Sequence, residues 1–94
     1  MQDVILIAHR GASGNGHAPE NTLAAFQEAI NIGIDCVECD VHCTKDDQVV
    51  VIHDSSLNRT TNMKGFIKEM TLNEIKNADA GSWFDQKFKG ERIP

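Results

Sequence analysis

The chain has 94 residues, 9 of them basic and 14 acidic, which gives a formal net charge of −5 at pH 7. This length fits one small domain, and a hydrophobic content of 40% is too high for a disordered chain. The acidic balance, without a basic stripe carrying interleaved aromatic residues, excludes nucleic acid as the expected partner.

The same features predict a protein of the cytoplasm. The longest apolar run, Val4 to Ala8, is far shorter than the roughly 20 residues that a membrane-spanning helix needs. It also lacks the basic flank and the length of a secretory signal. Three closely spaced cysteines, Cys36, Cys39 and Cys43, are odd in number, which argues against a disulfide framework and agrees with a reducing compartment.

The first elements along the chain are predicted to be a strand, a loop and a helix. Continuous apolar residues from Val4 to Ala8 are typical of a parallel strand buried on both faces, and residues 12–17 have the composition of a loop. A helix is expected to begin with Asn21 as its N-cap and to end before Gly33. Because a strand is expected to follow, the pattern indicates the β-α-β beginning of an α/β fold.

Residues 35–44 are predicted to form one strand with a polar face and an apolar face, since side chains alternate along a strand. The polar face carries Cys36, Glu38, Asp40, His42 and Thr44. The apolar face carries Val37, Cys39, Val41 and Cys43. A tight turn at 45–47 and a second strand over 48–54 complete a predicted hairpin, which returns His53 toward the two carboxylates.

Beyond the hairpin the pattern loosens. Residues 55–65 are rich in Asn, Ser and Thr and are expected to form an ordered loop. A short helix over 71–77 is predicted from a capping box made by Thr71 and Glu74. Three aromatic residues are expected to anchor a small subdomain: Trp83, Phe84 and Phe88.

Five residues form the candidate site. His9 and Arg10 follow the first strand, Glu38 and Asp40 share a strand face, and His53 ends the hairpin. Functional groups gather at the carboxyl ends of the strands in a parallel α/β barrel. Two carboxylates at this spacing suit Mg²⁺ or Ca²⁺. Two histidines and an arginine beside a metal are the acid, base and charge clamp that phosphoryl transfer needs.

Structural interpretations compete with this one. Arg10 could pair with a surface acid, although Gly11 beside it is expected to leave room for a ligand. The two carboxylates could lie on a solvated strand face, but buried like charges are costly without a cation. His42 is expected to be a structural residue near the site, and His17 to be an inert loop residue.

The cysteines have two interpretations as well. Cys36-x-x-Cys39 followed by His42-Cys43 resembles the ligand spacing of a zinc knuckle. In a strand, however, Cys36 and Cys39 point to opposite faces. We therefore expect the thiols to be small buried hydrophobes, with a knuckle-like loop as the alternative.

Taken in order, seven short motifs resemble the opening of the glycerophosphodiester phosphodiesterase family. They are His9-Arg10-Gly11, Pro19 to Thr22, Val37 to His42, Thr44 to Asp46, Ile52 to Asp54, Leu57 to Thr61, and Asp79 to Phe84. The resemblance implies a TIM (β/α)8 barrel that hydrolyses small glycerophosphodiesters to glycerol 3-phosphate and an alcohol with a divalent metal, Mg²⁺ or Ca²⁺. It makes His9 and His53 the general acid/base pair without assigning which is which, Arg10 a phosphate contact, and Glu38 and Asp40 metal ligands.

The resemblance also divides the chain into residues 1–54, the barrel start with its hairpin, and residues 55–94, part of a cap insertion. Glu20 matches a family position near the mouth of the site, with a structural role near the helix start as the alternative. Asp47 stands where the family usually has glycine, and we expect the turn to tolerate it. Because a TIM barrel takes about 250 residues, we expect this chain to be the N-terminal part of a longer enzyme. It would lack the third carboxylate ligand, have little activity alone, and self-associate through unpaired strand edges.

Two other functions fit the same residues. One is a relative of the lysophospholipase D type that acts on lipid head groups. The missing secretory signal and the unpaired cysteines argue against it. The other is a noncatalytic truncated module. An argument against it is that the chain retains His9, Glu38, Asp40 and His53.

Overall fold

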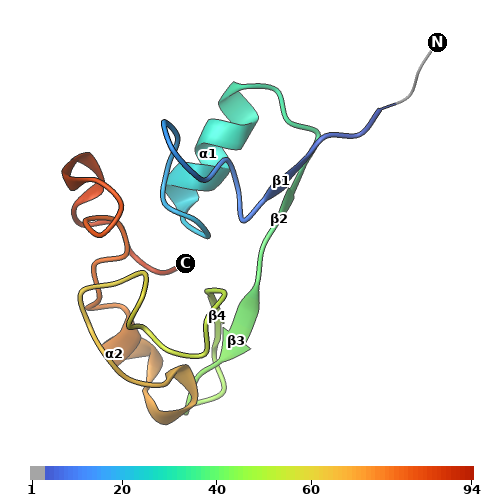
Figure 1. Ribbon diagram of the computed structural model, residues 1–94. Coiled ribbons are helices and arrows are strands. Elements are labelled where there is room, and N and C mark those ends of the chain that lie inside the picture. Colours follow the sequence, from blue (N-terminus) through green and yellow to red (C-terminus); the bar gives the residue numbers. More distant parts are fainter. Residues whose placement is uncertain (1–3) are drawn as a thin grey trace.

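The computed structural model describes residues 4–94, so the first three residues of the predicted barrel start lie outside the described part. Figure 1 shows the elements in chain order. They are β1 (Ile7–His9), α1 (Leu23–Asn31), β2 (Cys36–Glu38), β3 (Val41–Cys43), β4 (Val49–Val51) and α2 (Leu72–Ile75), with short 3-10 helices at Ile67–Glu69 and Gln86–Phe88.

The predicted β-α-β unit is present. β1 pairs in parallel with β2, with Ile7 opposite Cys36 and His9 opposite Glu38, and α1 connects the two strands. The first strand begins and ends later in the chain than the predicted Val4 to Ala8, because residues 7–9 are the ones that pair with β2. The unit therefore ends its two strands side by side at His9 and Glu38.

The helix begins at a different cap from the one predicted. Thr22, not Asn21, is the N-cap of α1, and its hydroxyl accepts a hydrogen bond from the Ala25 amide at 3.2 Å. Asn21 has φ of 54° and its side chain bonds elsewhere, so its backbone cannot take the extended cap conformation. The predicted end is confirmed, because Gly33 follows the helix with φ of 80°.

The single strand predicted over residues 35–44 is wrong: it is two strands with different partners. β2 pairs with β1, whereas β3 pairs with β4 in an antiparallel hairpin. The break falls at Cys39 and Asp40, where the Asp40 carbonyl accepts the Ile52 amide at 2.9 Å. The hairpin itself is confirmed, and Asp47 occupies its turn with φ of 60°.

The apolar face predicted for that strand is not buried. Val37 and Val41 are exposed in the described structure, and so are all three cysteine thiols. The prediction of buried thiols is therefore wrong for this chain, because it assumed one strand covered by apolar layers on both sides.

One apolar core lies entirely in the second half of the chain. Its buried members are Val50, Ile52, Leu57, Ile67, Ile75, Ala78, Ala80 and Ile93. The predicted capping box of α2 is present, with Thr71 and Glu74 bonding each other's backbone amides. The rings of Trp83 and Phe84, and of Phe84 and Phe88, meet edge to face in an aromatic cluster, but none of the three is part of the core and Trp83 is exposed.

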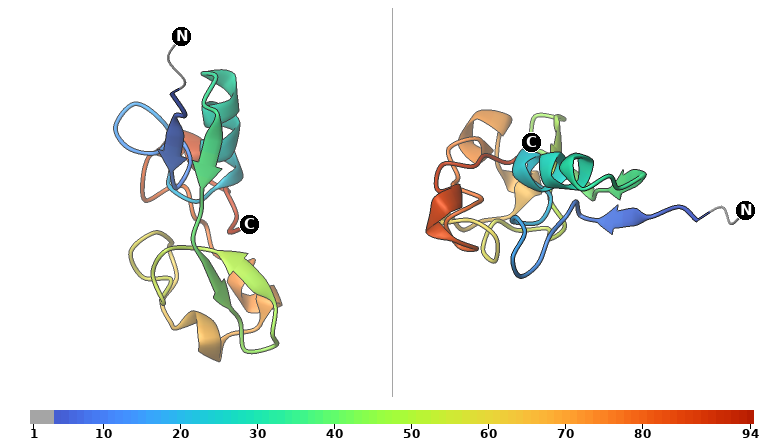
Figure 2. Two further views of the ribbon diagram at one scale, coloured as in Figure 1. Left: turned by 90° about the vertical axis from the view of Figure 1, so that its right-hand side faces the viewer. Right: turned by 90° about the horizontal axis from the view of Figure 1, so that it is seen from above.

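Packing therefore separates a parallel unit, residues 4–39, from a hairpin unit, residues 40–94, which combines the hairpin with residues 55–94. Figures 1 and 2 show β1, β2 and α1 at one end of the molecule and the hairpin with α2 at the other. Across residues 4–94, no helix has both the length and the apolar character required to cross a bilayer.

Candidate functional site

The carboxyl ends of β1 and β2 place His9 and Glu38 side by side. The two residues are register partners in the parallel pair. His9 Nε2 lies 3.7 Å from Glu38 Oε1, and both side chains are largely open to solvent. The predicted juxtaposition of these two residues is thus present.

Arg10 turns back into the molecule directly after β1. Its φ of 61° directs the chain into a turn, and its Nη1 donates to Glu20 Oε2 at 3.1 Å. Its Nε lies 3.6 Å from Asp40 Oδ2, and it is buried without a hydrogen-bond partner within residues 4–94. The side chain as a whole is 20% exposed, so an anion can still reach part of the guanidinium group.

Gly11 does not leave room for a ligand, contrary to the sequence interpretation. A Cβ at this position would lie 2.7 Å from Ala25 Cβ, and φ at Gly11 is 82°. Glycine is therefore required by the close packing of the turn on α1.

Asp40 is held by Asn21 from the parallel unit. Asn21 Nδ2 donates to Asp40 Oδ2 at 3.1 Å, and the Asp40 amide donates back to Asn21 Oδ1 at 3.4 Å. Asn21 is only 4% exposed. Its left-handed backbone, which asparagine tolerates better than most residues, thus aims a buried amide at the second predicted carboxylate.

His53 follows β4 and faces Asp54 and His42. His53 Nδ1 lies 2.9 Å from Asp54 Oδ1, and His42 Nε2 lies 2.9 Å from the His53 carbonyl oxygen. His42 therefore contacts the backbone of a site residue, as expected of a structural neighbour. His17 lies outside this group, with its Nδ1 3.9 Å from Glu28 Oε1.

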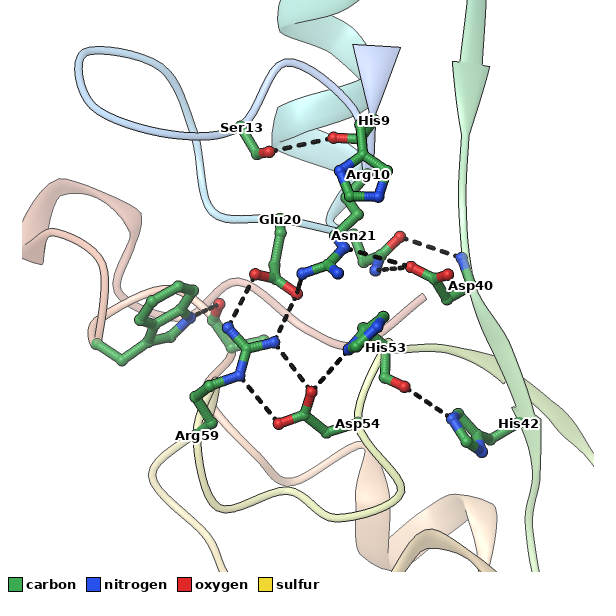
Figure 3. A network of polar contacts seen from close by, with 12 residues as sticks. His9, Arg10, Ser13, Glu20, Asn21, Asp40, His42, His53, Asp54 and Arg59 are labelled. Atoms are coloured by element: carbon green, nitrogen blue, oxygen red, sulfur yellow. Dashed lines mark hydrogen bonds and ion pairs between the residues drawn. The ribbon is translucent and has the colours of Figure 1, made fainter. Parts of the chain in front are cut away.

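Arg59 joins Asp54 to Glu20 and was not identified from the sequence. Its guanidinium donates to Asp54 at 2.9 and 3.0 Å and to Glu20 at 2.9 and 3.0 Å (Figure 3). The only sequence signal was its place in the motif Leu57 to Thr61, within a polar loop. Glu20 is thus a partner of two arginines, a role that neither sequence interpretation of this residue included.

The charges in this network set the ionisation of its acids. Hydrogen bonds from Arg59 and His53 hold the pKa of Asp54 far below its ordinary value. Partial burial alone would raise the pKa of Glu20, but the hydrogen bonds and charges of Arg59 and Arg10 outweigh it and lower that pKa. Both groups are therefore carboxylates at neutral pH, and Asp54 and Glu20 together raise the pKa of Arg59.

Glu38 and Asp40 could supply part of a metal site. Their side chains are 46% and 28% exposed, so each can offer a carboxylate oxygen to a hard cation. Within the described residues, no group of three or more His, Cys, Asp and Glu side chains is arranged to hold a metal ion. Because Mg²⁺ and Ca²⁺ take six or more oxygen ligands, the pair fits such an ion as a partial ligand set.

A cavity of about 430 Å³ opens beside this network. Glu20 forms one wall, together with the loop at residues 13–16 and the segment Trp83 to Asp85. The cavity thus lies where a loop of the parallel unit faces the aromatic cluster of the hairpin unit.

The fold and this arrangement define the opening of a parallel α/β barrel whose site lies at the carboxyl ends of its strands. The sequence model of the Glycerophosphoryl diester phosphodiesterase family matches residues 9–94. The chain belongs to this family.

Relatives and solved structures agree with that assignment. A glycerophosphodiester phosphodiesterase of Caldanaerobacter subterraneus is 57% identical over 90 residues, which are 96% of this chain and 36% of that protein. The crystal structure of a glycerophosphodiester phosphodiesterase from Agrobacterium tumefaciens superposes with a TM-score of 0.92 at 46% identity, over 98% of this chain and 39% of that one. An Oleispira antarctica phosphodiesterase, solved with the product sn-glycerol-3-phosphate, superposes with a TM-score of 0.90 at 46% identity, over 97% and 36% of the chains.

The chain therefore spans about a third of the length of the curated relatives that it matches. Its fold is that of the first part of the family's TIM barrel.

Proposed function

We propose that this chain is the N-terminal part of a metal-dependent hydrolase that cleaves small glycerophosphodiesters into glycerol 3-phosphate and an alcohol. The observation that carries the proposal is that His9 lies beside Glu38 and Arg10 beside Asp40, with His53 facing Asp40 in Figure 3. Family membership and the product bound to the Oleispira antarctica relative support the same chemistry.

In this proposal the two histidines divide the proton transfers. One of His9 and His53 removes a proton from the attacking hydroxyl, and the other protonates the leaving alkoxide. Such general acid–base steps contribute roughly 10²- to 10⁴-fold each. His53 would use its Nε2, because its Nδ1 is engaged by Asp54.

Arg10 would bind the phosphate oxygens. Glu20 holds its Nη1, and 20% of the side chain remains exposed for contact with an anion. A guanidinium fixed in this way stabilises the charge that develops on the phosphoryl group. Arg10 would thus be a phosphate clamp that is oriented before the substrate arrives.

Glu38 and Asp40 would hold the divalent metal, Mg²⁺ or Ca²⁺, together with oxygen ligands from outside this chain. When bound, such an ion would polarise the phosphodiester as a Lewis acid. Asn21 would keep the Asp40 carboxylate oriented through its two hydrogen bonds.

Residues 55–94 would form a cap that shapes access for the alcohol moiety. The cavity bounded by Glu20 and the segment Trp83 to Asp85 supports this role, because it combines a residue of the network with aromatic walls. The division of the chain at residue 54 belongs to this proposal.

A cytoplasmic setting completes the proposal. All three cysteines are free and exposed within the described part of the chain, as suits a reducing compartment. The 94 residues by themselves would self-associate, since the parallel pair leaves apolar side chains and strand edges open.

The test is glycerol 3-phosphate release by the complete chain that the gene encodes. We expect hydrolysis of a small glycerophosphodiester, its loss on metal chelation, and at least a 100-fold lower kcat in His9→Ala and in His53→Ala. His17→Ala is the matched control, because His17 contacts Glu28 outside the site. Full activity in both site variants would overturn the assignment.

A second substrate and the short chain complete the test. Preference for a lysophospholipid would move the protein to the lysophospholipase D type, and inactivity toward both substrates would favour a noncatalytic module. The purified 94-residue chain is expected to show little turnover, because its two carboxylates are only part of a metal ligand set.

A further inference from the structure

We propose that Arg59 is a positioning residue that fixes the catalytic orientation of His53 through Asp54, with Glu20 as its anchor in the parallel unit. The catalytic part of this inference rests on the proposed function. Its geometric part concerns only the orientation and the tautomer of the His53 ring.

Arg59 is bidentate along two edges of its guanidinium group. Its Nε and Nη2 donate to the two oxygens of Asp54 at 2.9 and 3.0 Å. Its Nη1 and Nη2 donate to the two oxygens of Glu20 at 3.0 and 2.9 Å. Two parallel hydrogen bonds to each carboxylate fix the plane as well as the position of the guanidinium.

The Asp54 carboxylate passes this constraint to His53. Asp54 Oδ1 accepts from Arg59 Nη2 and also lies 2.9 Å from His53 Nδ1. Because an ionised carboxylate only accepts hydrogen bonds, the proton must be on His53 Nδ1. A neutral ring then presents an unprotonated Nε2, and Figure 3 shows the ring facing the gap between Asp54 and Asp40.

The loop that carries Arg59 is held firmly despite its polar composition. Leu57 is fully buried, and its carbonyl accepts from the Thr61 hydroxyl at 2.7 Å. Asn58 Oδ1 accepts the Gly65 amide at 3.1 Å. Arg59 therefore projects from a fixed backbone, as a positioning residue must.

Glu20 links this constraint to the proposed phosphate clamp. Its Oε2 accepts from Arg59 Nη2 at 2.9 Å and from Arg10 Nη1 at 3.1 Å. One carboxylate thus sets the distance between the arginine that orients His53 and the arginine assigned to phosphate. Arg59 itself is not among the residues assigned to substrate.

The experiment compares wild type with Arg59→Ala and Arg59→Lys in the complete chain that the gene encodes. The first readout is the ¹⁵N NMR signature of the His53 ring, assigned by its loss in His53→Ala. We expect the Nδ1–H tautomer in wild type and a mixture of tautomers in Arg59→Ala. Lysine has a single ammonium group in place of the bidentate guanidinium. Arg59→Lys should therefore restore the wild-type signature only in part.

The second readout is the separation of kcat from KM. We expect kcat to fall about 10- to 100-fold in Arg59→Ala, because a misplaced catalytic group costs up to roughly 10²-fold. KM should change less than threefold, since Arg59 does not contact substrate in this proposal. Arg92→Ala is the matched control, since Arg92 donates to the Ala78 carbonyl in the hairpin unit.

The outcomes separate this inference from the proposed function. An Nε2–H tautomer in wild type, or an Arg59→Ala spectrum identical to wild type, would overturn the positioning role. A loss of kcat no larger than in Arg92→Ala would overturn it too. If wild type hydrolyses nothing, the proposed function fails while the tautomer measurement still decides the role of Arg59.

Discussion

The two units of this chain bury very different side chains. In the parallel unit the buried apolar residues are mainly alanines, such as Ala25 and Ala29 of α1, while Ile30 is 67% exposed. The hairpin unit instead buries full-sized side chains, and Leu57 is 0% exposed. Burying such a side chain stabilises by about 1.5–3 kcal/mol. The hairpin unit thus closes a core of its own, whereas the parallel unit presents the apolar surface that a barrel strand and helix offer to neighbours.

This difference is expected to appear most strongly in core truncations. In the 94-residue chain, Leu57→Ala should lower the free energy of unfolding by about 2–5 kcal/mol, because it opens a cavity in the core. Ile30→Ala should change it by less than about 1 kcal/mol, because the side chain is already exposed. Urea unfolding measures both, with Trp83 fluorescence reporting on the hairpin unit and circular dichroism on the helix of the parallel unit. Equal losses in the two variants would show that the parallel unit also closes a core.

Removing the cap of α1 should weaken the parallel unit alone. Thr22→Ala deletes the hydroxyl that accepts the Ala25 amide and donates to the Pro19 carbonyl. A lost N-cap costs about 0.5–2 kcal/mol. Circular dichroism should therefore report helix loss at lower denaturant, while the Trp83 transition stays in place. If both transitions move together, the two units unfold as one.

The ion pairs of Arg59 should hold the units together in a pH-dependent way. The pKa of Asp54 lies below its ordinary value of 3.8, and that of Glu20 below 4.5. A lowered pKa contributes stability above the ordinary value, and this stability is lost as the pH falls through the lowered pKa. Wild type should therefore lose more stability than Arg59→Ala as the pH falls from 6 toward 3.

At neutral pH the same variant should lower the free energy of unfolding by only about 0.5–1 kcal/mol, since partly exposed ion pairs are screened by solvent. Melting temperatures across this pH range, at low and at high salt, give the measurement. Parallel curves for the two proteins would contradict the assigned role of these pairs.

The smallest effect is expected at the hairpin turn. Asp47 has φ of 60°, a conformation that glycine adopts without strain. Asp47→Gly should therefore stabilise the hairpin unit by about 0.5 kcal/mol, because relief of strain outweighs the added freedom of the unfolded chain. Asp47→Ala is the matched comparison, expected to destabilise. Urea midpoints measured for the two variants should move in opposite directions.

Local signals in the sequence were enough to predict several elements of the fold. The turn residues at 45–47, the Thr71 and Glu74 capping box, and the helix end at Gly33 all depend on neighbours within a few residues. The exchange of strand partners at Asp40 depends on contacts distant in sequence, so alternation alone predicted one strand. The cysteines were predicted to be buried because the same single strand was assumed, and in the structure they are exposed.

The site divides in a similar way. The sequence pointed to His9, Arg10, Glu38, Asp40 and His53 through strand ends, shared faces and family motifs, and their catalytic roles stay predictions. It missed Arg59 because its partner Glu20 lies 39 positions away in the chain. It also missed the amide of Asn21 on Asp40, because helix capping offered that residue another role.

Two adjacent backbone hydrogen bonds at the end of β4 join distant parts of the chain. The amide of Ile52 bonds the carbonyl of Asp40 at 2.9 Å, and the adjacent amide of Val51 bonds the carbonyl of Pro94 at 3.0 Å. The first and last residues of the hairpin unit therefore lie close together, each bonded to one of two adjacent residues. Close ends are the geometry at which insertion of a segment is tolerated, so residues 40–94 can change in length and sequence with little strain on β1, β2 and α1.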